Sequence, residues 1–236
     1  MTFEPIRRTS ASQQVMQQIQ SLIFNGTYQP GDRLPPEREL AAELGVNRTT
    51  LREALKRLEQ LGLLSIRHGD GTRVLDIYSH ARIELLGSLL LSQAATNPRL
   101  IEDLFEAREV VGLELARKAA RRRTPEDLEK MRLLLAQLDE AREVPEVQLL
   151  ELEFFYALAQ ASSNTFYLFL INSIRQVYVE FRELYAATAQ DSQQVKRLQE
   201  GVVDAVERKD ERAAARRMSR YLEYGRVQVF RAFGLE

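Results

Sequence analysis

GDRLPPERELAAELGVNRTTLREAL, residues 31–55, contains two short helical patterns separated by a turn. Apolar residues recur at helical spacing over 37–44 and predict a helix with one buried face. Gly45 suits the left-handed backbone found at many helix ends, and Asn47 is a favoured N-cap for the helix that follows. The stretch therefore predicts a helix-turn-helix.

The second of these helices has a buried side and a polar side. Leucines recur along the buried side, at Leu51, Leu55 and Leu58. In DNA-binding helix-turn-helix units the first residues of the second helix reach base edges in the major groove. Arginine can bind guanine through two hydrogen bonds there, and threonine can contact phosphate or a thymine methyl group. The polar side carries residues of both kinds: Arg48, Thr49, Thr50 and Arg52. The alternative interpretation is an ordinary helical hairpin with a solvated basic face.

A β-hairpin is expected after this helix. Two short strand-like runs, 63–67 and 72–76, flank the turn sequence His68-Gly69-Asp70-Gly71. A helix-turn-helix followed by such a hairpin is a winged helix. Arg67 and Arg73 flank the tip and can contact phosphates. His68 is either a DNA contact or a solvated turn residue.

PGDRLPPERELAAELGVNRTTLREALKRLEQLGLL, residues 30–64, resembles the DNA-binding domain of the GntR family of bacterial transcription regulators. In that family the arginine of the P-x-E-R segment and the arginines of the recognition helix contact operator DNA, and the wing tip enters the minor groove. The resemblance implies a palindromic operator, a homodimer and these DNA-contacting residues: Arg38, Asn47, Arg48, Thr49, Thr50, Arg52, His68 and Gly69.

Helical patterns follow one another from residue 78 to the end of the sequence. Thr124-Pro125-Glu126-Asp127 is a strong start signal, because Thr can cap the helix, Pro suits its first position and acids suit its first turn. The predicted fold is mainly α: a winged helix-turn-helix over residues 1–76, and an all-helical bundle for effector binding and dimerisation over residues 77–236.

Composition narrows the functional classes. The first 75 residues hold ten Lys and Arg against eight Asp and Glu, a net charge of +2, so DNA binding must depend on where the arginines lie. The sequence has no cysteine, no secretory signal near its start and no apolar run long enough to span a bilayer. We therefore expect a cytoplasmic protein without membrane association. No nucleophile–base pair or Gly-rich phosphate loop is present, which argues against an enzyme.

The bundle resembles the effector domain of the FadR subfamily within the GntR regulators. Many members bind a divalent metal there through one aspartate and three histidines. The matching positions are Glu151, Phe155, Gln199 and Tyr221, and neither Phe nor a protonated Tyr is a useful ligand for such a metal. We therefore expect no metal and no cofactor.

The departure from the metal-binding pattern points to the metal-free, fatty-acid-responsive branch of the subfamily, whose effector is a long-chain acyl-CoA. The segment SSNTFYLFLINSIRQVYVEFRELY, residues 162–185, resembles the corresponding helix of that branch. Arg108 lies on an otherwise apolar helix, where it either binds an acidic effector or forms a salt bridge with Glu106 or Asp103. The expected effector site comprises Arg108, Glu151, Phe155, Tyr178, Gln199 and Tyr221.

Several alternatives remain at this point. The effector can be a small organic acid instead of an acyl-CoA, and a protein of another class would be a helical enzyme or lipid carrier with a nucleic-acid-binding module. Aromatic residues at helical spacing are also typical of a hydrophobic core. We expect that core role for most of Phe154, Phe166, Phe169 and Phe181.

Overall fold

The computed structural model describes residues 10–93, 97–185 and 191–235, with backbone only at 176–185 and 233. The chain forms two compact units, Met1–Ser92 and Gln93–Glu236. Where the two functional domains divide, which the sequence places between residues 76 and 77, stays a prediction.

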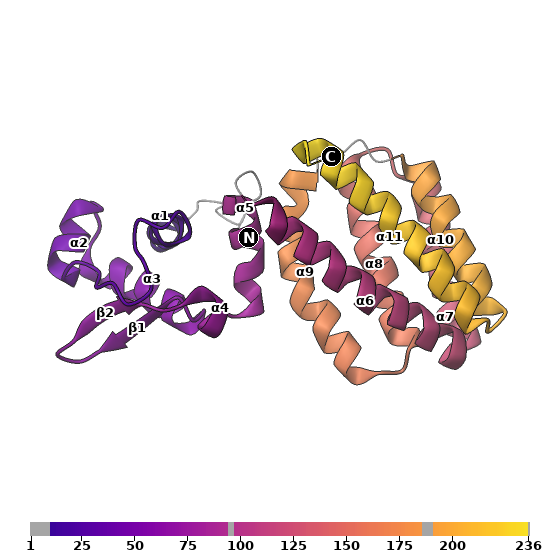
Figure 1. Ribbon diagram of the computed structural model, residues 1–236, viewed down its shortest axis with the longest axis horizontal. Coiled ribbons are helices and arrows are strands. Elements are labelled where there is room, and N and C mark those ends of the chain that lie inside the picture. The colour runs from indigo at the N-terminus through magenta and orange to yellow at the C-terminus, as the bar shows by residue number, and fades with distance from the viewer. Residues whose placement is uncertain (1–9, 94–96, 186–190, 236) are drawn as a thin grey trace, which may run out of the picture. The chain divides into compact units, whose positions relative to one another are not determined.

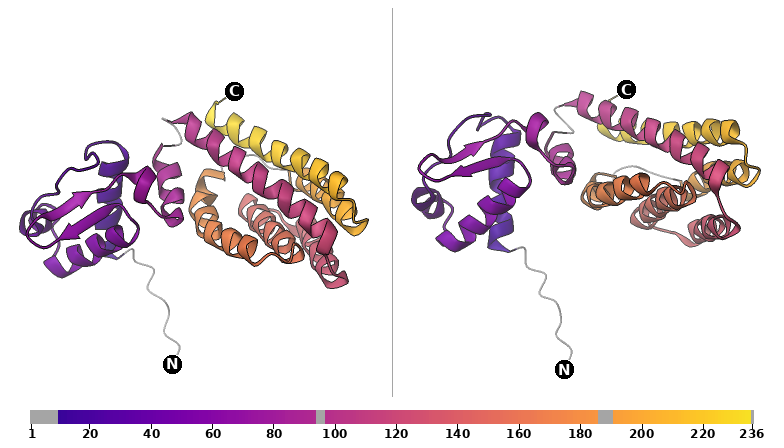
Figure 2. Two further views of the ribbon diagram at one scale, coloured as in Figure 1. Left: turned by 60° about the horizontal axis from the view of Figure 1, so that its bottom comes forward. Right: turned by 90° about the horizontal axis from the view of Figure 1, so that it is seen from below.

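The first unit is a winged helix-turn-helix, as predicted (Figure 1). Its elements are α1 (Ala11–Phe24), α2 (Glu37–Glu43), α3 (Arg48–Gln60), β1 (Leu64–Arg67), β2 (Gly71–Val74), α4 (Ile77–His80), the 3-10 helix η1 (Ile83–Leu85) and α5 (Leu86–Gln93). The two strands are antiparallel, with Leu64 opposite Val74 and Arg67 opposite Gly71. Figure 2 shows this hairpin as a pair of arrows among the helices of the unit.

A third backbone segment, residues 31–34, runs along β2. The amide of Gly31 donates to the carbonyl of Val74 at 2.8 Å, and the amide of Leu34 donates to the carbonyl of Thr72 at 2.9 Å. The amide of Val74 donates in return to the carbonyl of Asp32, also at 2.9 Å. The segment that leads into α2 is therefore fixed to the wing.

The core of this unit comes from α1 and α3. The buried side of α3 is the leucine side expected from the sequence, and Leu51, Leu55 and Leu58 are at most 1% exposed. Gly62 closes the turn after α3 with φ +79°, a conformation that L side chains rarely adopt. A Cβ at this position would lie 2.0 Å from the carbonyl oxygen of His80, so α4 approaches too closely for any other residue.

The second unit is the predicted all-helical bundle (Figures 1 and 2). Its helices are α6 (Pro98–Arg122), α7 (Pro125–Glu140), α8 (Val144–Ala161), α9 (Thr165–Tyr185), α10 (Ser192–Glu207) and α11 (Glu211–Phe233). The start signal of α7 is confirmed: Thr124 and Asp127 form a capping box, in which each side chain accepts the other's backbone N–H. Helices α6 and α11 lie side by side, where Gly112 leaves room for Leu222.

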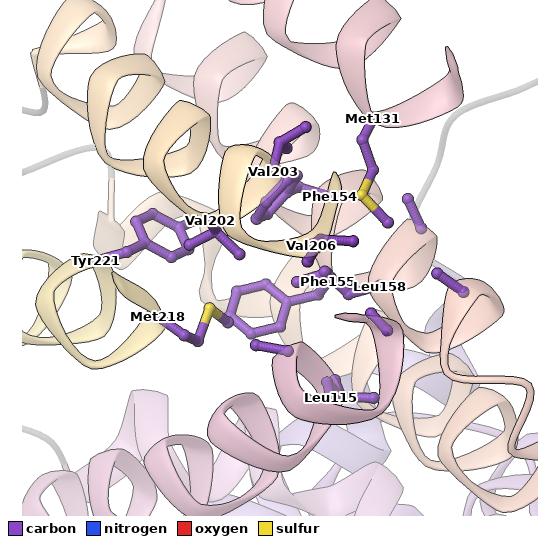
Figure 3. Close-up of a cluster of buried hydrophobic side chains, with 14 of the residues drawn as sticks. Leu115, Met131, Phe154, Phe155, Leu158, Val202, Val203, Val206, Met218 and Tyr221 are labelled. Atoms are coloured by element: carbon purple, nitrogen blue, oxygen red, sulfur yellow. The ribbon is translucent and has the colours of Figure 1, made fainter. Parts of the chain in front are cut away.

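The centre of the bundle is a cluster of aromatic, aliphatic and methionine side chains (Figure 3). Phe154 is fully buried within it, as expected. The same expectation was wrong for Phe166 and Phe169, which are 83% and 65% exposed. Both lie on the outer side of α9, while Ile171 is buried on its inner side. Helical spacing identified a stripe of apolar residues but not which side of the helix faces the core. The Phe181 side chain lies outside the described residues.

Candidate DNA interface and effector site

The start of α3 is fixed by its cap. The Asn47 Oδ1 accepts a hydrogen bond from the Thr50 amide at 2.8 Å, which satisfies one of the free N–H groups of the first turn. Arg48 and Thr49 are exposed beside it, and Thr50 is half-buried. The cap therefore orients a short polar surface that is open to solvent.

Helix α2 contributes two residues to this surface: Arg38, which was predicted, and Glu37, which the sequence patterns did not identify. Arg38 is exposed on α2, as a DNA contact must be. Its neighbour Glu37 accepts a hydrogen bond from the Nε of Arg52 on α3 at 2.6 Å. Arg52 nevertheless remains 64% exposed. The two residues are 15 positions apart, and no local sequence pattern pairs them.

The wing tip carries His68 and Gly69, both exposed, with Gly69 at φ +83°. Arg73 does not extend freely from the wing. Its Nε and Nη2 donate to the two carboxylate oxygens of Asp70, each at 2.9 Å, and its Nη1 donates to the carbonyl of Gly31 at 3.0 Å. Arg73 thus braces the wing, and its contact with a DNA phosphate stays a prediction.

Electrostatics at the wing follow from this bidentate pair. The hydrogen bond from Arg73 lowers the pKa of the Asp70 carboxyl, and the charges of Arg73, Arg33 and Arg67 add to the effect. Asp70 therefore stays ionised at neutral pH and offsets part of the positive charge at the base of the tip. Arg67, which is exposed at the end of β1, keeps its charge available on the surface.

Four of the expected effector-site residues meet inside the bundle. The Oη of Tyr221 on α11 donates to the Oε1 of Glu151 on α8 at 2.6 Å, and the Nε2 of Gln199 on α10 donates to the same Oη at 3.1 Å. All three side chains are at most 3% exposed. The ring of Phe155 lies 6.0 Å from that of Tyr221 at an angle of 33°. Among the described residues the Gln199 Oε1 accepts no hydrogen bond.

Arg108 lies next to this group. Its guanidinium carbon is 5.1 Å from the ring centre of Phe155 and 5.8 Å from that of Phe105, within the range of cation–π attraction. A Cβ at Gly225 would come to 3.3 Å from the Arg108 Nη1, so glycine leaves space for the guanidinium. Tyr178, the remaining expected residue, belongs to α9, but its side chain lies outside the described residues.

A hollow of about 340 Å³ opens between α6 and α11. It is lined by Glu102, Phe105, Glu106, Glu109, Glu223, Arg226 and Phe230. Arg226 donates two hydrogen bonds to Glu223, which lowers the pKa of that carboxyl and raises the pKa of the guanidinium. With four carboxylates and one paired arginine, this hollow disfavours an anionic ligand.

Within the described ranges, no three His, Asp or Glu side chains are grouped so that they could hold a metal ion. Among the described helices, none is both long enough and apolar enough to cross a bilayer.

Comparisons with known proteins assign both units. Residues 11–74 match the gntR family of bacterial regulatory proteins, and residues 103–224 match the FCD domain. The chain belongs to the gntR family and combines its helix-turn-helix with an FCD effector-binding domain, which makes it a transcription regulator and not an enzyme.

Individual relatives agree with this assignment. The chain is 35% identical over 162 residues to an uncharacterised HTH-type transcriptional regulator of Mycobacterium tuberculosis, covering 69% of this chain and 66% of that protein. It is 33% identical over 175 residues to the fatty acid metabolism regulator protein of Pasteurella multocida, covering 74% and 71%. Among solved structures, the GntR protein of Streptococcus agalactiae aligns over 92% of this chain and 99% of its own, with 27% identity and a TM-score of 0.50.

Proposed function

We propose that this chain binds a palindromic operator as a homodimer in the bacterial cytoplasm and that a long-chain fatty acyl-CoA releases it. The DNA-binding part is supported by the exposed arginines of α2 and α3 and by the capped start of α3. A single module with one recognition helix and one wing buries too little surface for tight specific binding at physiological salt. Two copies would read two half-sites. The proposed contacts are Arg38, Asn47, Arg48, Thr49, Thr50, Arg52, His68 and Gly69.

Alanine substitutions test these contacts. Arg48→Ala and Arg52→Ala should each weaken operator binding by about 1–3 kcal/mol, because each removes a bidentate contact to a base. Arg57→Ala is the matched control, since Arg57 is also exposed on α3 but pairs with Glu53 away from the proposed face. Affinities are measured at one salt concentration by fluorescence anisotropy. Equal affinities for wild type and all three variants would remove the basis for this interface.

The effector part depends chiefly on the buried Phe155–Tyr221 pair and its hydrogen bonds to Gln199 and Glu151. These groups offer aromatic surface and a few polar atoms in place of a metal that could anchor a small dicarboxylate. Each buried methylene contributes about 0.8 kcal/mol, so a chain of ten or more could reach micromolar affinity after ordering costs. Arg108 can pair with the anionic part of the ligand, and Tyr178 completes the proposed site. Relatives named as fatty acid metabolism regulators support the same ligand class.

The mechanism we propose is a population shift. The ligand binds one dimer geometry better than another, and in the favoured geometry the two recognition helices no longer match the half-site spacing. Acyl-CoAs of increasing chain length are titrated into the protein–operator complex, with lactate, glycolate, citrate and added zinc as comparisons. Release that grows with chain length is expected. Release by a small hydroxy acid, or only with zinc, would favour the organic-acid alternative instead.

Dimerisation has its own measurement. Sedimentation equilibrium of the full chain, alone and with operator DNA, should give twice the monomer mass in the free state and two copies per duplex in the complex. A monomer in both states would exclude the homodimer.

A further inference from the structure

Glu37 is the first residue of α2 and reaches across to the recognition helix. Its Oε2 accepts from the Nε of Arg52 at 2.6 Å. The Glu37 side chain is 32% exposed and that of Arg52 is 64% exposed, so the pair lies at the surface but Glu37 is the more enclosed partner. Exposed pairs of this kind add little to folding stability. The main consequence of the contact is therefore its effect on the position of Arg52.

The geometry of the Arg52 guanidinium shows what this effect is. Arginine can present two parallel N–H groups to guanine in two ways, from Nε with one Nη or from both Nη groups. Because Glu37 occupies the Nε of Arg52, only the outer pair remains for a base edge. Among the described residues, no hydrogen bond is made by either Nη of Arg52. The outer pair is thus not engaged by another described residue, and the Arg52 side chain is 64% exposed.

A carboxylate beside a DNA-facing arginine also has an electrostatic effect. Glu37 places a negative charge close to where phosphates would lie, which weakens binding to any duplex. At the same time it restricts the long side chain of Arg52 before binding, so less conformational entropy is lost when the specific complex forms. For random DNA only the repulsion acts, and it lowers the affinity. For the operator the smaller entropy loss acts as well, and it raises the affinity.

We propose that Glu37 is a specificity-determining positioning residue, which holds Arg52 by its Nε so that the outer N–H pair reads guanine end-on while the carboxylate disfavours random DNA. This inference rests on the proposed operator contact of Arg52. It assigns to Glu37 a role in discriminating the operator from DNA of random sequence.

The experiment uses the full chain, a duplex selected from a random-sequence pool by the wild-type protein, and a duplex of scrambled sequence. Glu37→Ala should weaken binding to the selected duplex about threefold to tenfold, from the lost pre-organisation of one long side chain. It should strengthen binding to the scrambled duplex about twofold, because one negative charge near the phosphates is removed. The ratio of the two affinities at a single salt concentration should therefore fall at least fivefold. Glu37→Gln, which keeps an acceptor for Nε, should recover part of the ratio.

Glu39→Ala is the matched control. Glu39 lies in the same first turn of α2 and has the same charge, but the structure shows no ion pair for it among the described residues. It should leave the affinity ratio near the wild-type value. In an Arg52→Ala background, Glu37→Ala should not lower the ratio further.

Two results would overturn the inference, and they are distinguishable. If Arg52→Ala leaves the affinity for the selected duplex unchanged, the proposed operator contact fails and the role of Glu37 fails with it. If Arg52→Ala weakens binding but Glu37→Ala shifts the affinities for both duplexes by the same factor, the contact stands and only the positioning role is refuted.

Discussion

Tyr221→Phe tests the buried polar group of the FCD bundle most directly. The substitution keeps the ring and removes only the hydroxyl, which donates to Glu151 at 2.6 Å and accepts from Gln199 at 3.1 Å. A hydrogen bond contributes about 0.5–1.5 kcal/mol net, and leaving a buried partner unsatisfied costs about 1–3 kcal/mol. Because the three side chains are buried, water cannot replace the lost partner, and we expect a loss of about 2–4 kcal/mol in the free energy of unfolding.

Urea denaturation of the full chain, followed by circular dichroism at the helix signal, measures this loss. For a chain of this size, a cost of 2–4 kcal/mol corresponds to a melting temperature lower by roughly 5–15 °C. Tyr156→Phe is the control, since Tyr156 is half-buried on the same helix as Glu151 and its hydroxyl has no hydrogen bond among the described residues. It should cost less than about 0.5 kcal/mol.

A Tyr221→Phe variant within about 0.5 kcal/mol of wild type, or an equal cost for Tyr156→Phe, would refute the stabilising role of these hydrogen bonds. A double-mutant cycle with Glu151→Gln provides a second measurement. Glutamine keeps a neutral acceptor for the Tyr221 hydroxyl, so this change tests the carboxylate itself. The sum of the two single costs should exceed the cost of the double variant by at least about 0.5 kcal/mol, because both changes disturb the same hydrogen bond.

Three further predictions concern stability. Gly62→Ala should cost about 2–4 kcal/mol, because the new Cβ would lie 2.0 Å from the His80 carbonyl at a left-handed position; a melting temperature unchanged from wild type would contradict this close approach. Asn47→Ala should cost about 1 kcal/mol in urea denaturation through loss of the α3 cap, and a cost near zero would mean that solvent replaces it. The hydrogen bond from Lys196 lowers the pKa of Asp139, so its contribution is present above the ordinary carboxyl value of 3.8 and is lost as the pH falls through the lower folded value. The stability difference between wild type and Lys196→Met should therefore shrink on acidification from pH 7 toward pH 3, and a difference independent of pH would rule out this linkage.

Local signals explain why the DNA-binding unit could be predicted from the sequence. The turn glycine, the Asn47 cap and the leucine stripe of α3 each act within a few residues, and each is present in the structure. What the sequence could not reveal depends on distant partners. The bond between Arg52 and Glu37 spans 15 residues and that between Arg73 and the Gly31 carbonyl spans 42, so only folding brings them together.

The bundle shows the same division. The start of α7 and the succession of helical stripes follow from local sequence, whereas the exposed Phe166 and Phe169 show that hydrophobicity alone does not tell which stripe faces the core. The meeting of Glu151, Gln199 and Tyr221 was anticipated through family resemblance. Their hydrogen-bond directions required the three-dimensional structure, because they come from three different helices.

The backbone segment 31–34 beside β2 affects how the protein behaves at high concentration. A two-stranded hairpin normally leaves two open edges, each able to pair with a strand from another molecule. Here the amides of Gly31 and Leu34 occupy the outer edge of β2. The outer edge of β1 is also partly occupied, because the Ile66 amide donates to the Oε1 of Glu59 at 2.8 Å. The exposed Arg67 at its end adds a charge that opposes strand pairing there. Loosening residues 31–34 should therefore make the protein prone to aggregate through β2.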